Sequence, residues 1–169
     1  LSLVGSEMCI RDRLETATIE NSKNTGNVIG STNIGGIAGE SKGTITQCRN
    51  DGQVSKVVGV ICKTVNLGGL VGKNGEAARL SNSKNYGNVN SETDTLVNLG
   101  GICGILYNNS IVELCENNGA ISGSGKEIIP NEDTNTNCAS CTSNNGGSAS
   151  TDDFGQLNIG IIYGKYQEI

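Results

Sequence analysis

The sequence predicts an all-β protein, a parallel β-solenoid (β-helix-like) of about four Asn/Gly-rich coils. The chain contains 25 glycines, one phenylalanine and no tryptophan, so its core must be built from small aliphatic residues. A segment of about 32 residues recurs along the chain. Within each copy, isoleucine, valine and leucine alternate over short stretches between glycine or Asn-Gly turns, a pattern typical of short strands and not of helices.

Each copy begins with a first signature, in which an apolar residue, a small residue and a charged residue are followed by Asn-x-Gly and then by valine or isoleucine. The signature covers residues 19–28, 45–54, 80–89 and 112–121. Its glycines are Gly26, Gly52, Gly87 and Gly119, so successive copies are 26, 35 and 32 residues apart. These steps indicate coils of similar size.

A second signature of the form Asn-Ile/Leu-Gly-Gly-Ile/Leu-x-Gly follows each first one. Its asparagines are Asn33, Asn66, Asn98 and Asn158. Its closing glycines are Gly39, Gly72, Gly104 and Gly164. The asparagines are 33, 32 and 60 residues apart, and the fourth copy lacks the second glycine of its Gly-Gly pair. The long last step places an irregular insertion, about residues 122–156, inside the fourth copy; we expect an excursion loop there, with a recognition loop as the alternative.

Coils that stack about 4.8 Å apart place equivalent residues in columns. We expect one apolar column of Ile37, Leu70 and Ile102, and another of Val28, Val54, Val89 and Ile121. The second-signature asparagines are expected at equivalent turns, where their amides can hydrogen-bond along the axis. The glycines are expected to supply positive φ or a close approach between coils. The repeated glycines and asparagines are therefore the predicted site residues, with a structural role; no catalytic, cofactor or metal site is predicted.

The Gly-Gly-Ile/Leu-x-Gly element, preceded by Asn-Leu and followed by Cys/Ser-x-Asn-x-Gly-x-Val, resembles the GLUG motif, and residues 68–72 are its nearest instance. The resemblance covers residues 18–122 well and 157–164 poorly. It implies a large secreted or cell-surface bacterial protein, sometimes adhesin-like, in which the repeats are accessory. The implied function is a non-catalytic structural or adhesive repeat module. Its implied partners are an unknown protein or glycan on a host or cell surface and the flanking repeats of the same chain.

The alternative function is a truncated carbohydrate-active β-helix enzyme or an accessory region of a surface peptidase. Enzymatic β-helices cluster acidic residues on one face. Here no acidic residue recurs at one coil position, apart from a group of acids inside the insertion, and the chain has no histidine. We therefore expect no enzymatic activity. The net charge of −5 without a basic cluster argues against nucleic acid as a partner, and no apolar run is long enough to span a membrane.

The cysteines suggest one local motif. Cys138 and Cys141 form a C-x-x-C, but a structural zinc site usually needs a second such pair or histidines. A loop disulfide and two ordinary thiols remain the open alternatives. Cys48 and Cys115 occupy a position that is serine in the other two copies. They are two coils apart, about 9.6 Å, which exceeds the ~7 Å limit for a disulfide.

The beginning of the chain is expected not to belong to the fold. Residues 3–12 resemble one translated reading frame of a transposon-end sequencing adapter. Residues 1–13 are therefore expected to be an adapter-derived artefact, and residues 14–169 a single repeat domain. This expectation implies a truncated N-terminus in which a signal peptide is not observable.

Overall fold

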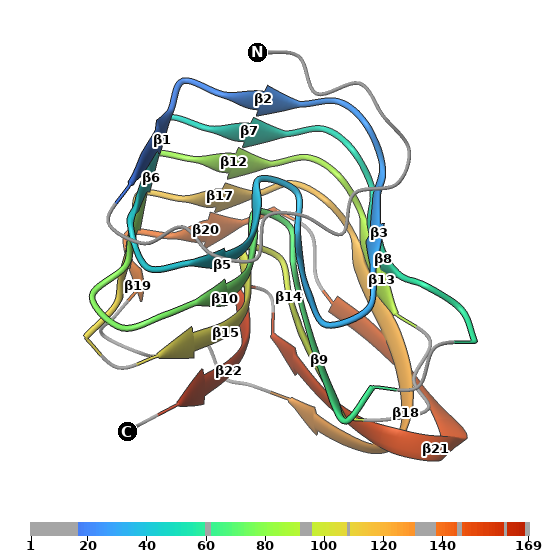
Figure 1. Cartoon of the computed structure of the whole chain (residues 1–169). Helices are drawn as coiled ribbons and strands as arrows, with labels where there is room; N and C mark the ends of the chain where they lie inside the picture. Colours follow the sequence, from blue (N-terminus) through green and yellow to red (C-terminus); the bar gives the residue numbers. More distant parts are fainter. Residues whose placement is uncertain are drawn as a thin grey trace.

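The computed structural model describes residues 17–59, 62–91, 96–107, 109–130, 138–144, 147–160 and 162–167. The predicted adapter-derived residues lie outside this part. The described residues form strands and no helix, and all of the strand pairs are parallel. Figure 1 shows the strands stacked coil upon coil. The prediction of an all-β parallel solenoid is therefore confirmed.

The first three coils each contribute five strands. The first coil contains β1 (Thr18–Glu20), β2 (Lys23–Asn24), β3 (Val28–Gly30), β4 (Asn33–Gly35) and β5 (Ala38–Ser41). The second contains β6 (Thr44–Thr46), β7 (Arg49–Asn50), β8 (Val54–Lys56), β9 (Thr64–Gly68) and β10 (Val71–Asn74). The third contains β11 (Arg79–Ser81), β12 (Lys84–Asn85), β13 (Val89–Ser91), β14 (Leu96–Gly100) and β15 (Cys103–Tyr107).

The rest of the chain contributes seven more strands. These are β16 (Ile111–Glu113), β17 (Glu116–Asn117), β18 (Ile121–Pro130), β19 (Cys138–Ala139), β20 (Thr142–Ser143), β21 (Gly147–Gly160) and β22 (Tyr163–Gln167). The strands form four sheets, with the orders β1-β6-β11-β16-β19, β2-β7-β12-β17-β20, β5-β10-β15-β22 and β3-β8-β13-β18-β21-β14-β9-β4.

The predicted insertion contains strands and not only a loop. β19 pairs with β16, and β20 pairs with β17, so residues 138–143 begin a fifth coil. The first part of β18 pairs with β13, whereas the last part of β21 pairs with β14. Between these parts the register of β18 and β21 shifts at Gly125/Glu127. The chain therefore forms the first strands of a fifth coil before β21 and β22 complete the fourth coil. This order explains why Asn98 and Asn158, the last two asparagines of the second signature, are 60 residues apart.

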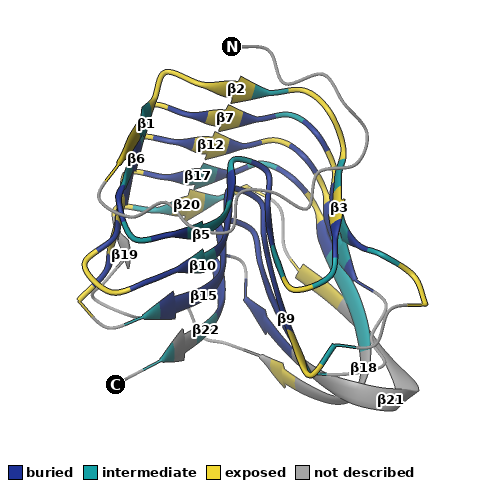
Figure 2. Ribbon diagram, viewed as in Figure 1, coloured by how far each residue is buried: buried dark blue, intermediate teal, exposed yellow. Residues whose placement is uncertain are grey.

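Two apolar clusters fill the coils, and Figure 2 shows the buried inner rows. The first cluster lies between the rows that contain β1, β2 and β5, and it includes Leu70, Leu80 and Ile102. The second lies between the rows that contain β3 and β4. The predicted valine column is present, because the register aligns Val28, Val54, Val89 and Ile121. Ile37, Leu70 and Ile102 contribute to the first cluster, with Ile37 only partly buried.

Candidate functional site

The asparagines of the first signature form a hydrogen-bonded ladder along the sheet that contains β2. Its members are Asn24, Asn50, Asn85 and Asn117. Each Nδ2 donates to the Oδ1 of the asparagine in the following coil, at 2.8 or 2.9 Å. Asn117 donates instead to Ser143 Oγ at 3.2 Å, so the fifth coil ends the ladder with a hydroxyl. We call this column the first ladder.

Each interior asparagine of the first ladder has all of its hydrogen-bonding capacity used. Asn85 Nδ2 donates to Gly87 O at 2.8 Å, and its Oδ1 accepts from Gly87 N at 3.2 Å. The same side chain accepts from Asn50 and donates to Asn117. Two donors and two acceptor lone pairs are therefore satisfied in a side chain that is fully buried. This closed pattern accounts for the recurring Asn-x-Gly, because the four bonds need an amide side chain, and the short asparagine amide bonds to the glycine two residues further on.

The glycines of the first signature have a steric role. A Cβ added to Gly52, Gly87 or Gly119 would lie under 3.0 Å from the carbonyl oxygen of the preceding coil's glycine. At Gly26, in the first coil, the nearest atom would be Asn24 Oδ1 at 3.7 Å, an ordinary contact. A side chain at the interior positions would therefore separate the coils, whereas one at Gly26 would not.

The asparagines of the second signature form a second ladder. Its members are Asn33, Asn66, Asn98 and Asn158, which lie in β4, β9, β14 and β21. Each member after Asn33 donates from Nδ2 to the Oδ1 of the preceding member, at 2.7, 2.6 and 2.6 Å. The expectation that these residues lie at turns is wrong, because they are strand residues. Asn98 and Asn158 are 60 residues apart in sequence, yet β14 and β21 pair directly and keep their amides aligned.

The two ladders run in opposite directions. In the first ladder each amide donates toward the C-terminal coils, and in the second each donates toward the N-terminal coils. Hydrogen bonds within such a chain polarise one another in one direction. Because the directions are opposed, the dipoles of the two ladders oppose each other across the coil.

The second glycines of the first two Gly-Gly pairs, Gly36 and Gly69, pack against the first ladder. A Cβ at Gly36 would lie under 3.0 Å from the Asn50 amide, and one at Gly69 under 3.0 Å from the Asn85 amide. The two signatures are therefore in contact across the interior of the coil. Ile161, which replaces this glycine in the last copy, lies outside the described residues.

Three of the closing glycines allow β10, β15 and β22 to approach the row that contains β4. A Cβ at Gly72, Gly104 or Gly164 would lie under 3.0 Å from the backbone of that row. The atoms in question include Ile34 N, Leu67 N and Leu99 N. Gly39 lies at the equivalent place in β5. These glycines bring two sheets close together.

Positive φ occurs at a position that the sequence analysis missed. The corner before the first ladder is left-handed in every coil, with φ between 48° and 54°. It is occupied by Asn21, Gln47, Asn82, Leu114 and Ser140. None of the predicted repeat glycines has positive φ, and the described glycine that does is Gly59. Because five coils use four residue types at this corner, the sequence gives no single-residue signal for it.

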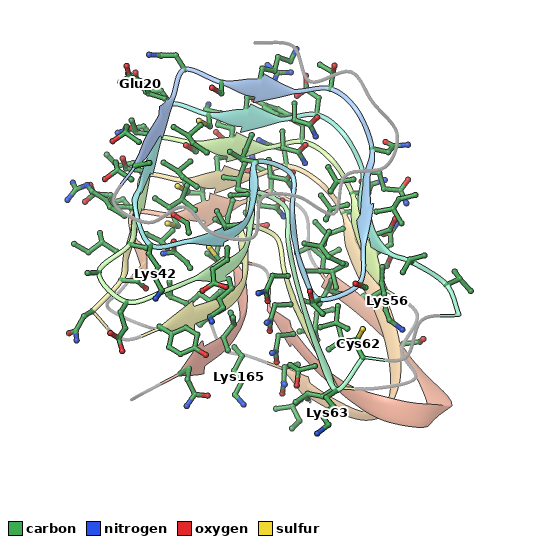
Figure 3. The ribbon with its side chains drawn as sticks, in the orientation of Figure 1. Glu20, Lys42, Lys56, Cys62, Lys63 and Lys165 are labelled. Carbon is green, nitrogen blue, oxygen red and sulfur yellow. The ribbon has the colours of Figure 1, made fainter. Side chains whose placement is uncertain are left out.

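The outer surface carries exposed charges, as the labelled Glu20 and Lys63 show in Figure 3. Near the start of the first ladder, Asp51 accepts from Arg49 at 2.5 Å and pairs with Lys23 at 2.8 Å. Hydrogen bonds from these cations lower the pKa of Asp51. The Arg49 guanidinium lies 4.2 Å from the centre of the Tyr86 ring.

A second ion pair lies further along the same sheet. Lys84 Nζ is 2.8 Å from Glu116 Oε2, and hydrogen bonds from Lys84 and Asn118 lower the pKa of Glu116. A catalytic acid in a glycosidase needs a raised carboxyl pKa. Asp51 and Glu116 have the opposite shift, so they suit a solvated charged surface.

The two cysteines of the predicted C-x-x-C lie in the fifth coil, next to strands of the fourth. Cys141 aligns with Cys115 in neighbouring rows, and neither of them is in a disulfide in this structure. Cys138 aligns with Val112. The described residues contain no group of three or more His, Cys, Asp or Glu side chains that could hold a metal ion.

The chain matches no protein-family model, and it shows no significant similarity to a curated protein or to a solved structure. Across the described part of the chain, no helix is long and apolar enough to cross a membrane.

Proposed function

We propose that this chain is a non-catalytic structural or adhesive repeat module of a larger secreted or cell-surface bacterial protein. The observation that carries the proposal is that the recurring residues make contacts between coils and sheets. The asparagines of both signatures bond coil to coil, and most of the signature glycines allow coils or sheets to approach closely. The residues that the sequence repeats therefore build a spacer, and the outward side chains are free to differ between coils.

The outward rows support a display role. In the sheet that contains β2, the outward residues that precede the four ladder asparagines and Ser143 are Lys23, Arg49, Lys84, Glu116 and Thr142. This row varies from coil to coil while the inward row is nearly constant. A constant interior with a variable exterior suits a module that presents a surface to a partner. The resemblance to the GLUG motif supports placing that partner outside the cell.

An adhesion assay tests the binding part of the proposal. Beads coated with the full chain are passed over immobilised mucin glycoprotein and over immobilised fibronectin, as one glycan-rich and one protein-rich surface. The control beads carry the chain with Asn85→Ala, which removes the central rung of the first ladder. We expect the wild-type beads to be retained on at least one surface and the control beads to be retained less. Equal retention of wild-type, control and albumin-coated beads contradicts an adhesive role.

A hydrolysis assay tests the non-catalytic part. The full chain is incubated with pectin, alginate and hyaluronan, and new reducing ends are measured. We expect no release above that of a heat-unfolded sample. Release by the folded chain contradicts the proposal and favours the carbohydrate-active alternative.

A further inference from the structure

Two thiols meet where the fifth coil begins. β17 pairs with β20 in the register Glu116 with Thr142, so the preceding residues, Cys115 and Cys141, are also aligned. The Thr142 amide donates to Cys115 O at 2.9 Å, which fixes this alignment on the backbone. Aligned residues in neighbouring parallel strands lie about 4.8 Å apart. That separation is inside the Cα range of roughly 4.4–6.8 Å that a disulfide requires.

Both side chains point to the same interior. Cys115 is 1% exposed and belongs to the first apolar cluster, and Cys141 is partly buried and packs against that cluster. The two thiols are in hydrogen-bond contact; this contact and burial raise the pKa of Cys115. Neighbouring position, a common side-chain direction and side-chain contact all favour a cross-link between the two residues.

The other described cysteines are less suitably placed to form a disulfide with Cys115. Cys48 shares the column of Cys115 but lies two rows away, with Ser83 between them. Cys62 packs against the second apolar cluster. Cys103 is buried in the first cluster, and its pKa is raised by burial and by the nearby Cys141, so it is the competitor that a test must exclude.

We propose that Cys115 and Cys141 form a disulfide bond that fastens the fifth coil to the fourth in an oxidising environment. The oxidant is a low-molecular-weight disulfide. The Cys141 thiolate attacks it, forms a mixed disulfide and releases one small thiol. The Cys115 thiolate then attacks Cys141 Sγ, forms the Cys115–Cys141 bond and releases the second small thiol. Two protons leave the protein thiols, and two electrons reduce the oxidant to two thiols.

The cross-link joins a coil in which the repeat is altered. β19 contains two residues and its partner β16 contains three, and Ser143 stands where the preceding coil has Asn117. A disulfide restricts the unfolded chain and so favours the folded coil. Because the raised pKa of Cys115 keeps its thiolate scarce near neutral pH, cross-linking is expected to be faster at mildly alkaline pH.

Peptide mapping tests the proposal on the full chain. The reduced protein is treated with oxidised glutathione at mildly alkaline pH, alkylated and digested at glutamate without reduction. Cleavage at Glu113 and Glu116 isolates residues 114–116, which contain Cys115 and not Cys103. We expect this peptide to be joined to the peptide of residues 133–168. Its recovery as an alkylated monomer, or a link from the peptide that contains Cys103, overturns the proposal.

Variants identify the partner within residues 133–168. Cys141→Ser should abolish the linked peptide, whereas Cys138→Val should retain it, since valine is the residue aligned with Cys138 in the preceding coil. Cys115→Ser is expected to fold, because Ser83 fills the same column in the third coil, and it should also abolish the link. Oxidation should raise the Tm of the wild-type chain by roughly 5 °C or more and leave the Tm of Cys115→Ser unchanged. A link that survives Cys141→Ser, or an equal Tm shift in both proteins, contradicts the assignment.

Discussion

The substitution Asn85→Ala removes the central rung of the first ladder. The side chain is fully buried and makes four hydrogen bonds, two to Gly87 and one each to Asn50 and Asn117. A hydrogen bond contributes about 1 kcal/mol net, so the four together contribute about 4 kcal/mol. Gly69 packs against the Asn85 side chain, and since glycine has no side chain it cannot fill the space that Asn85→Ala leaves.

The neighbours decide whether the loss is larger. Asn50 Nδ2 keeps its bond to Gly52 O, and Asn117 Oδ1 keeps its bond from Gly119 N. Each neighbouring amide keeps one bond, but one buried N–H of Asn50 loses its acceptor, so the cost of an orphaned polar group adds to the four lost bonds. We therefore expect Asn85→Ala to lower the free energy of unfolding by at least about 4 kcal/mol. This is a large part of the ~5–15 kcal/mol that a domain usually has.

Urea unfolding of the full chain, followed by far-UV circular dichroism, measures the effect. The matched control is Asn88→Ala in the same coil, because Asn88 is exposed and makes one bond, accepting from Ala120 N at 3.0 Å. That control should cost about 1 kcal/mol or less. Equal urea midpoints for the two variants would refute the reasoning that the buried ladder couples the coils.

Three further predictions follow from the same geometry. Gly87→Ala should destabilise the chain by about 3 kcal/mol or more, because the added Cβ would meet Gly52 O. Gly26→Ala should change the stability by less than about 1 kcal/mol, because its Cβ would make only an ordinary contact. Similar Tm values for the two variants would contradict the steric role of the glycines. Leu114→Asn should raise stability by about 1 kcal/mol, since Leu114 is exposed and has φ 52°, and a lower urea midpoint would contradict this. The lowered pKa of Asp51 means that its ion pairs stabilise the fold above its unfolded pKa and lose that effect as the pH falls through its folded pKa. Asp51→Asn should therefore reduce the drop in Tm between neutral and acidic pH, and an unchanged drop would show that these exposed pairs contribute nothing.

Sequence reasoning reaches the coil architecture because the repeated residues are the residues that determine it. Spacing alone predicts the columns of Val28 and of Asn33, since a stack of equal coils must align equivalent residues. The same reasoning misses the first ladder, although its asparagines stand in the Asn-x-Gly signature. In that signature the glycine indicates a turn, but the hydrogen bond that joins the coils is made by the asparagine two residues earlier.

The fifth coil is hidden for a physical reason. Cys138, Ser143 and Gly147 stand where the fourth coil has valine, asparagine and isoleucine, so the segment keeps the spacing but loses the signature. Among the described strands, β19 and β20 each pair with one neighbour, so their residue types are less restricted than those of strands paired on both sides. The exchange of β18 and β21 is a long-range pairing that no local pattern encodes.

Deletion of one complete coil tests most directly the claim that the coils are equivalent units joined by their ladders. Removing residues 79–110 from the full chain joins Ala78 to Ile111, which is aligned with Arg79, and gives Asn50 a new partner in Asn117. We expect this chain to fold, with the same far-UV circular dichroism per residue and a cooperative melt. A chain that lacks only residues 96–110, the second half of the same coil, should not fold. If the full-coil deletion unfolds the chain as completely as the half-coil deletion, the coils are not equivalent units and the account is wrong.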